Sequence, residues 1–312
     1  MTGRLTAAEV DVRPLVEADL ADADQIMRLA FGTFLGLPDP MAFMGDGDYV
    51  RSRWRADRTA ALAADADGKV VGSNFATRWG SVGYFGPLTV HPSLWDRGIA
   101  RRLLAHTMEI MDGWRLSHCG LFTFGHSPKH IALYQSFGFL PRFLTAVLSA
   151  PVSPPGVPSA EWTAYSADPD RPGRLADCAV LTDTIYPGLD VSRELTACDE
   201  QGLGDTVLLP GGSGFAVCHV GPGSEAESGT CFVKFAAARA APDFDRLLRA
   251  CEAFAASRGA VRLVAGMNTG RRDAYRKLLQ RGFAADLIGV TMHRPDEPGY
   301  SRPDSYVIDD WR

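Results

Sequence analysis

Hydrophobic and polar residues are spaced along the first half of the chain in a way that predicts strands and helices in turn. Apolar positions three and four residues apart predict a helix over residues 20–34 and a second helix that continues to about Met111. Short apolar or alternating runs predict strands at residues 10–15, 60–64, 70–77, 81–90, 121–124 and 143–148. The sequence Asp-Ala-Asp-Gly at residues 65–68 predicts a hairpin turn between the second and third of these strands.

The second half of the chain repeats this order of elements. The pattern predicts helices over residues 175–185, 244–255 and 271–281, and strands at residues 207–209, 215–220, 231–236, 262–265 and 288–293. In both halves a strand, a long helix, a strand and a short helix are followed by Gly-Phe and a last strand. The two pairs, Gly138-Phe139 and Gly282-Phe283, lie 144 residues apart (282 minus 138). We infer an internal duplication.

A proline-rich stretch separates the two halves. Residues 150–160 contain four prolines and no charge, which is typical of a semi-rigid linker. A chain of 312 residues is long enough for two separate cores. We therefore expect one domain at residues 1–150, a linker at residues 151–160 and a second domain at residues 161–312.

The first candidate for chemistry lies between residues 87 and 104. The strand over residues 81–90 runs into a loop, and Gly98 stands where the loop becomes the helix that continues to Met111. A glycine lets a ligand approach the backbone, and the free amides and dipole of a helix start attract an anion. Arg97, Arg101 and Arg102 add fixed positive charge. Together these features predict a phosphate site.

This segment resembles the acyl-CoA pyrophosphate loop of the GNAT superfamily, the acyl-CoA-dependent N-acyltransferases. Gly98 and Ala100 match the family pattern, whereas Trp95 replaces an arginine or glutamine and Asp96 places a carboxylate near the phosphate. The resemblance implies that acyl-CoA is bound by the loop and helix start, which comprise Trp95, Asp96, Arg97, Gly98, Ile99, Ala100 and Arg101.

A second motif follows about thirty residues later, at residues 127–139, SPKHIALYQSFGF. It resembles the GNAT signature in which a helix carries Leu-Tyr and ends on Gly-Phe. Here Ser127 replaces the usual asparagine and His130 the usual alanine. The resemblance implies that Tyr134 protonates the CoA thiolate as general acid. A phenol suits this role, because its ordinary pKa of about 10 keeps it protonated at neutral pH.

The resemblance also implies a fold. It predicts an α/β protein with two GNAT-like domains in tandem, each a twisted mixed β-sheet flanked by helices. The sheet is expected to splay between the strands at residues 81–90 and 121–124, so that the backbone of Thr89 and Val90 pairs with the pantetheine arm as an added strand would.

Each group around the expected acceptor site allows two interpretations. His126 lies at a strand end facing the expected reaction centre, so it is either the general base or a loop histidine without a role. Asp39, Asp46 and Asp48 either attract a cationic amine or belong to a solvated acidic loop. Glu225 and its neighbour Glu227 either face a cleft between the halves or form a solvated turn.

The second half lacks the residues of this chemistry. The loop before its long helix has no glycine, and Asp243 and Asp245 occupy the helix start, where they can cap the amides that a pyrophosphate needs. Leu278 stands four residues before Gly282, at the place that Tyr134 occupies in the first half. We expect a non-catalytic scaffold that closes one wall of the acceptor pocket. The tail at residues 302–312 is expected to pack on the body, and whether it enters the active site is left open.

Composition narrows the class of protein. Hydrophobic residues at 46% and charged residues at 22% are ordinary for a soluble globular protein, and no run approaches membrane length. A net charge of -5 without a long basic run argues against a nucleic-acid partner. Six scattered cysteines without a Cys-x-x-Cys pair, and no signal peptide, indicate a reduced cytoplasmic protein, and we expect no metal. Scarce lysine with abundant alanine and glycine points to a bacterial origin.

These observations together predict an N-acetyltransferase. Acetyl-CoA is the expected co-substrate, and the acetyl group passes directly to a primary amine on a small molecule or peptide. One alternative is an acyl-CoA-binding or sensing module without catalysis, which Trp95 and Asp96 favour. Another is a structural protein without a CoA site, which the arginines around Gly98 disfavour. The sequence identifies neither the acceptor nor the oligomeric state.

Overall fold

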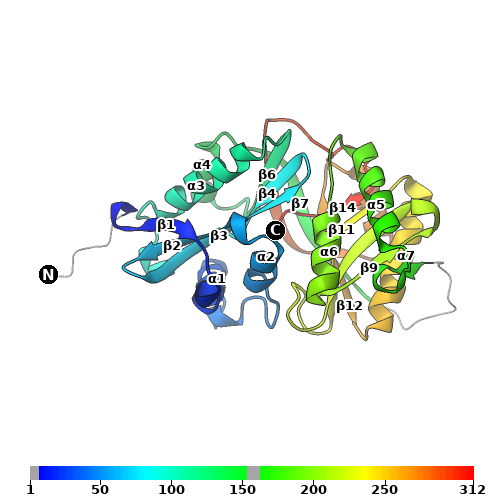
Figure 1. Ribbon diagram of the computed structural model, residues 1–312, viewed down its shortest axis with the longest axis horizontal. Coiled ribbons are helices and arrows are strands. Elements are labelled where there is room, and N and C mark those ends of the chain that lie inside the picture. The colour runs from blue at the N-terminus through cyan, green and yellow to red at the C-terminus, as the bar shows by residue number, and fades with distance from the viewer. Residues whose placement is uncertain (1–6, 153–161) are drawn as a thin grey trace.

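The protein is described by a computed structural model that covers residues 7–152 and 162–312. Within these residues fourteen strands form one continuous mixed sheet, with helices on both of its faces (Figure 1). The main path of the sheet is β1-β2-β3-β4-β6-β13-β7-β12-β11-β10-β9-β8, while β5 pairs with β3 and β14 pairs with β11. The predicted α/β class is confirmed.

The first half contains most of the elements that surround the site. Its helices are α1 (Leu20–Leu35), α2 (Val50–Ala56), α3 (Ile99–Gly113) and α4 (Pro128–Gln135). Its strands are β1 (Asp11–Pro14), β2 (Ala61–Ala66), β3 (Lys69–Trp79), β4 (Val82–Phe85), β5 (Thr89–Val90), β6 (His118–Thr123) and β7 (Leu140–Pro151). The predicted helices and the β2–β3 hairpin are present, with ends shifted by a few residues.

The second half repeats the parallel core of the first. Its helices are α5 (Arg171–Ile185), α6 (Ser192–Gln201), α7 (Ala241–Ser257) and α8 (Arg272–Gln280), and its strands are β8 (Thr163–Ala164), β9 (Gly204–Leu208), β10 (Gly214–Val220), β11 (Thr230–Ala238), β12 (Arg262–Asn268), β13 (Ala284–Arg294) and β14 (Val307–Ile308). β11 and β12 are parallel and joined through α7, just as β4 and β6 are parallel and joined through α3. The hydrophobic pattern does not predict α6, because most of its residues are polar and few are buried.

Helices cover both faces of the sheet in the first half. This covering explains the apolar strands of that half. In β2, Ala61 and Ala63 pack with α1 and α2, while Leu62 and Ala64 pack with α3 on the opposite face. Because successive side chains of a strand point to opposite faces, a strand between two helical layers is apolar throughout. α1 and α3 therefore lie on opposite sides of the strands that lead to the site.

The predicted strand over residues 81–90 is divided in two. β4 ends at Phe85 and β5 begins at Thr89, because Pro87 between them has no amide hydrogen to donate to a sheet. The pairing of β4 with β6 runs from Val82 to Tyr84, and β5 pairs instead with β3 at Gly72 and Ser73. Beyond Tyr84 the strands diverge, and the expected splay is present.

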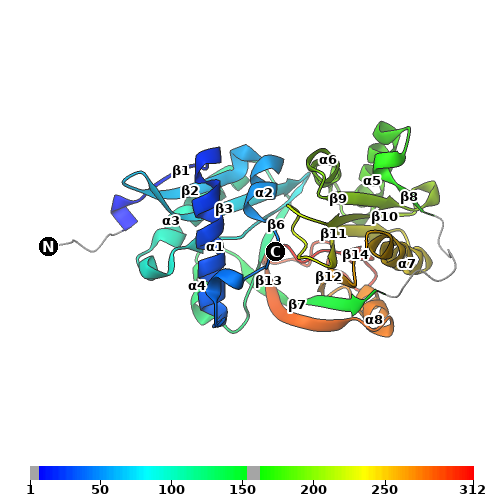
Figure 2. The ribbon, with the colours of Figure 1, turned by 90° about the horizontal axis from the view of Figure 1, so that it is seen from below.

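The last strands of the two halves are exchanged. β13, from the second half, pairs antiparallel with β6 of the first half, and β7, from the first half, pairs antiparallel with β12 of the second. β7 and β13 also pair with each other, and Figure 2 shows them side by side where the halves meet. The halves therefore share one sheet, where the sequence predicts a sheet for each.

The predicted linker lies largely outside the described residues. Within them, Pro151 ends β7 and the amide of Val152 donates to the carbonyl of Val261 at 2.9 Å. The domain boundaries at residues 150 and 161 stay a proposal.

Candidate functional site

A cavity of about 780 Å³ lies in the first half, where β4 and β6 diverge. Its walls come from α1, the loop after α1, the segment from β4 to the start of α3, the end of β6 and α4, with Leu287 and Trp311 contributed by the second half. All residues that the resemblance assigns to acyl-CoA line it: Thr89, Val90, Trp95, Asp96, Arg97, Gly98, Ile99, Ala100 and Arg101. Arg102, the third arginine near Gly98, does not line it. Tyr134 lines the same cavity.

The loop before α3 has the geometry of an anion site. Gly98 is the N-cap of α3 with φ of 80°, a left-handed conformation that favours glycine, and no side chain caps the helix there. The first amides of α3 are thus left for a ligand, and the helix dipole adds positive character. Arg97 and Arg101 lie at the cavity, with Arg101 5.5 Å above the ring of Phe137.

The two departures from the family pattern have local explanations. The indole nitrogen of Trp95 donates to the carbonyl of Val90 at 2.8 Å, which ties the loop to the end of β5. Asp96 forms an ion pair with Lys129 at the start of α4. The carboxylate that would oppose a phosphate is therefore paired with a cation that also lines the cavity.

Tyr134 lies in the last turn of α4, a helix whose two ends are fixed by Ser127 and Gly138. Ser127 caps α4 by accepting from the amide of His130 at 3.4 Å, and Gly138 ends it with φ of 84°. The fully buried Phe139 packs on Phe85 at 5.5 Å between ring centroids, and Phe85 lies 5.8 Å from the ring of Tyr134. Burial raises the pKa of Tyr134 well above its ordinary value, partly offset by a hydrogen bond with the side chain of Thr123. The phenol is thus fixed and protonated at neutral pH.

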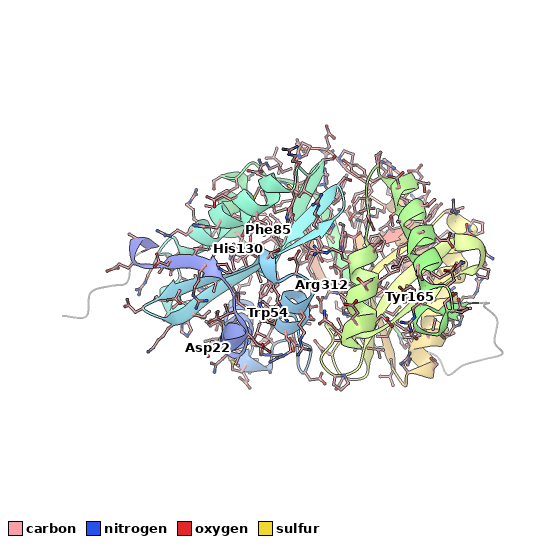
Figure 3. The ribbon with its side chains drawn as sticks, viewed as in Figure 1. Asp22, Trp54, Phe85, His130, Tyr165 and Arg312 are labelled. Atoms are coloured by element: carbon pink, nitrogen blue, oxygen red, sulfur yellow. The ribbon has the colours of Figure 1, made fainter. Side chains whose placement is uncertain are left out.

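The histidines near the site differ in position. His126 is exposed, stacks on Phe34 at 5.5 Å and is not among the residues that line the cavity. His130, labelled in Figure 3, is half-buried, lines the cavity and lies 4.9 Å from the ring of Phe34. Burial, and then Lys129 and His126, lower its pKa, so its imidazole is uncharged at neutral pH. His130 lies one helical turn before Tyr134, on the same face of α4, a spacing that is visible in the sequence.

The acidic residues of the loop after α1 bind backbone amides, two of them near the loop itself and one in the second half. Asp39 accepts from the amide of Met41 at 3.0 Å, Asp48 accepts from the amide of Arg51 at 2.9 Å, and Asp46 accepts from the amide of Ser228 at 2.7 Å. None of these three carboxylates lines the cavity.

The same loop contributes apolar side chains to the cavity, namely Phe43 and Met44. The guanidinium of Arg28 fixes this stretch by donating to the carbonyls of Phe43, Gly45 and Gly47 at 2.6 to 2.9 Å. Sequence reasoning missed these lining residues, although the run MAFM at residues 41–44 is an apolar signal in an otherwise polar loop.

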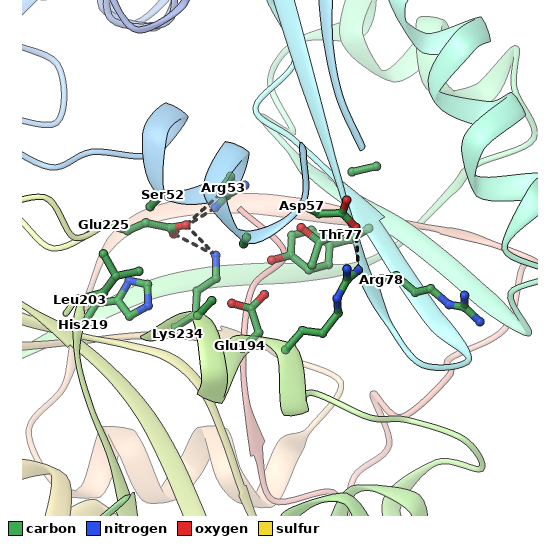
Figure 4. Close-up of a pocket in the computed structure, with 15 residues that line it drawn as sticks. Ser52, Arg53, Asp57, Thr77, Arg78, Glu194, Leu203, His219, Glu225 and Lys234 are labelled. Atoms are coloured by element: carbon green, nitrogen blue, oxygen red, sulfur yellow. Dashed lines mark hydrogen bonds and ion pairs between the residues drawn. The ribbon is translucent and has the colours of Figure 1, made fainter. Parts of the chain in front are cut away.

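A second, smaller cavity of about 30 Å³ lies between the halves, beside a buried ion-pair cluster (Figure 4). Glu225, 3% exposed, accepts from Arg53 at 2.9 and 3.0 Å and from Lys234 at 2.9 and 3.0 Å. Glu225 thus belongs to the contact between the halves, while Glu227 is exposed. Arg53 also donates to the carbonyl of Gly86 at 2.6 Å, at the break between β4 and β5. The cluster therefore connects the second half to the wall of the larger cavity.

Residues 307–312 pack on the body of the protein, as the sequence predicts, and they reach the cavity. β14 pairs with β11, and Asp309 forms a buried ion pair with Arg271 at 3.0 Å. Trp311, 3% exposed, donates to the hydroxyl of Tyr300 at 2.8 Å and lines the cavity together with Arg312. Figure 3 places Arg312 near the middle of the molecule, between the two halves.

The corresponding positions of the second half are occupied by structural residues. α7 begins with Pro242 and Asp243 in its first turn, and Asp243 pairs with Arg246. Leu278, at the position that corresponds to Tyr134, is fully buried in the core of the second half. The residues that the sequence predicts to carry the chemistry thus all lie in the first half.

In the ranges 7–152 and 162–312, no helix combines the length and apolar character needed to cross a bilayer. Across the same part of the chain, no cluster of three or more histidine, cysteine or acidic side chains is placed to hold a metal ion.

Comparisons with known proteins agree with this geometry. Residues 25–139 match the profile described as Acetyltransferase (GNAT) family. The fold is similar to a crystal structure of a putative acetyltransferase from Pyrococcus horikoshii, with a TM-score of 0.70 and 16% identity over 100% of this chain and 98% of that one. It is also similar to a GCN5-related N-acetyltransferase from Sphaerobacter thermophilus, with a TM-score of 0.61 and 17% identity over 93% and 96% of the two chains. A third, from Anabaena variabilis, has a TM-score of 0.56 and 14% identity over 91% and 72%. No curated protein matches the sequence.

Proposed function

We propose that this protein is an N-acetyltransferase that uses acetyl-CoA to acetylate a primary amine. The match of residues 25–139 to the acetyltransferase (GNAT) family model supports this proposal. The observation that carries the proposal is the convergence of the loop around Gly98, the strand end at Thr89 and Val90, and Tyr134 on one cavity. In this proposal the first half is the catalytic domain and the second half is a scaffold derived by duplication.

The reaction proceeds by direct transfer. The neutral amine attacks the thioester carbonyl, a C–N bond forms, and the C–S bond of the tetrahedral intermediate then breaks. Backbone amide of the splayed strand polarises the carbonyl oxygen, and Tyr134 gives its proton to the departing thiolate sulfur. The amine proton leaves to a base, and Tyr134 is reprotonated from solvent.

Acetyl-CoA binding by calorimetry tests the proposal, with Gly98→Glu as the variant. The added carboxylate would occupy the anion site at φ of 80°, so we expect a loss of affinity of at least about 100-fold. Gly113→Glu is the matched control, because it places the same side chain in open space at the other end of α3. Binding that survives Gly98→Glu in a folded protein, or two sites per chain, would contradict this assignment. Binding without turnover on any amine would favour the sensing module.

For the proton acceptor, we propose His130, because it lines the cavity, ahead of the His126 that the sequence suggests. Replacing His130 by alanine should lower kcat/KM at neutral pH by about 10- to 100-fold, since general base catalysis is lost. His126→Ala removes the same ring from an exposed position four residues earlier and should leave kcat/KM unchanged. The pH profile of kcat/KM should lose its acidic limb in His130→Ala alone. Equal losses in both variants would count against a specific role for His130.

A further inference from the structure

One side of the large cavity is an aromatic and aliphatic wall that the acyl-CoA motif does not use. On α1, the side chains of Phe31 and Phe34 face the cavity at helical spacing. Phe43 stacks on Phe31 at 5.1 Å between ring centroids, and Phe124 lies 4.9 Å from Phe34. The rings form one continuous surface, which we call the aromatic wall: Phe31, Phe34, Phe43 and Phe124. It is extended by Met27, Met44, Leu133 and Leu287.

Among the described residues that line the cavity, the side chains offer no unpaired carboxylate to a cationic acceptor. Among the described residues that line it, Asp96 is the only one with a carboxylate side chain, and Lys129 is paired with it. The carboxylates of the neighbouring loop, on Asp39, Asp46 and Asp48, are bound to backbone amides outside the cavity. An acceptor with several ammonium groups would therefore lose hydration here without gaining an ion pair to a side chain for each of them, which is costly.

From the aromatic wall and this distribution of charge, we propose that the acceptor is a monoamine with an uncharged apolar body, an aromatic ring or a short alkyl chain. The body packs against Phe31, Phe34, Phe43 and Phe124, and the amino group lies beside His130. This inference rests on the proposed acetyltransferase function and specifies its substrate class. The pantetheine arm is assigned to Thr89 and Val90, on β5, so the wall on α1 and at the end of β6 is left for the acceptor.

The test compares 2-phenylethylamine and hexylamine with spermidine and glycinamide, with acetyl-CoA as donor and release of the CoA thiol as readout. We expect kcat/KM for the two apolar amines to exceed that for spermidine and glycinamide by about 100-fold, the upper range for apolar pocket discrimination. Spermidine or glycinamide as the better substrate would overturn the proposal.

A pair of variants tests whether the amine binds at the aromatic wall. Phe43→Glu puts a carboxylate into the wall, and Met41→Glu puts the same group on the same loop at a side chain that is 38% exposed and does not line the cavity. Phe43→Glu should raise KM for 2-phenylethylamine about 10-fold or more and lower KM for spermidine, with kcat less affected. Met41→Glu should change neither. Identical behaviour of the two variants would overturn the assignment.

Two further arms separate this inference from the proposed function and from a rival use of the wall. Calorimetry of 2-phenylethylamine against the CoA-loaded protein measures amine binding whether or not turnover occurs, and binding no tighter than that of spermidine overturns the inference. If the wild type does not bind acetyl-CoA, that result would instead count against the proposed function. The rival use predicts that, with glycinamide as acceptor, the wild type prefers octanoyl-CoA to acetyl-CoA and Phe43→Glu loses that preference. That result would assign the wall to the acyl chain and overturn the inference.

Discussion

Replacing Tyr134 by phenylalanine is expected to lower kcat by about 100- to 1,000-fold while the affinity for acetyl-CoA stays unchanged. The substitution removes one hydroxyl and keeps the ring that packs near Phe85, so the fold and the cavity are preserved. What is lost is the proton for the departing thiolate. Stopped assays of thiol release, with calorimetry of acetyl-CoA binding, measure the two effects separately.

The matched control is Tyr275→Phe. Tyr275 lies on α8, the helix of the second half that corresponds to α4 of the first. It packs against the core of the second half. Its kcat should match that of the wild type. Because burial raises the pKa of Tyr134, the wild type should also show no loss of activity from tyrosine ionisation up to about pH 10, the ordinary pKa of a phenol. Full activity of Tyr134→Phe would remove this residue from the mechanism.

Replacing Glu225 by glutamine is expected to lower the free energy of unfolding by about 3 to 5 kcal/mol, the range for a buried ion pair that loses one partner. Arg53 and Lys234 both donate to this carboxylate, and all three side chains are at most 7% exposed. The variant would leave two cations buried without their shared anion. Urea unfolding of the variant and the wild type at neutral pH measures the difference.

The difference in unfolding free energy between the wild type and Glu225→Gln should shrink as the pH falls. Burial alone would raise the pKa of Glu225, but Arg53 and Lys234 outweigh it and hold the pKa far below its ordinary value. A carboxylate with a depressed folded pKa stabilises above the ordinary value of about 4.3, and this stabilisation is lost as the pH falls below it. The gap between wild type and Glu225→Gln should therefore be full at pH 7 and narrow below about pH 4.

Glu227→Gln is the control for this prediction. It makes the same chemical change two residues along the same loop, where the side chain is exposed, so unfolding should change by less than about 0.5 kcal/mol. Since Arg53 also donates to the carbonyl of Gly86, Glu225→Gln should weaken acetyl-CoA binding more than Glu227→Gln does. Equal stability of the two variants would mean that the cluster contributes nothing net.

The sequence predicts those parts of the site that depend on local chain geometry. Gly98 at a helix start and Tyr134 four residues before Gly138 are short-range signals, because each describes a turn or a helix end that neighbouring residues determine. The choice between His126 and His130 as proton acceptor illustrates the limit, since it depends on which ring lines the cavity, and spacing along the chain does not reveal this.

Long-range contacts could not be predicted from spacing along the chain. Arg53 and Glu225 are 172 residues apart, and nothing in either local sequence indicates the other. The same holds for the pairing of β13 with β6, since nothing in the local sequence of β13 specifies its partner strand. Phe43 and Met44 lie in a loop rich in glycine and aspartate, and only the position of α1 makes them cavity residues.

The exchange of β7 and β13 also bears on the history of the protein. Once each half had given its last strand to the other, a deletion of either half would expose a sheet edge in the remaining one, next to Thr123 or to Asn268. Leu287, a wall residue of the cavity, is carried by the exchanged strand. On the proposal that the second half is a non-catalytic copy, the first half still requires it, because β13 covers the edge of β6 and supplies Leu287 to the cavity.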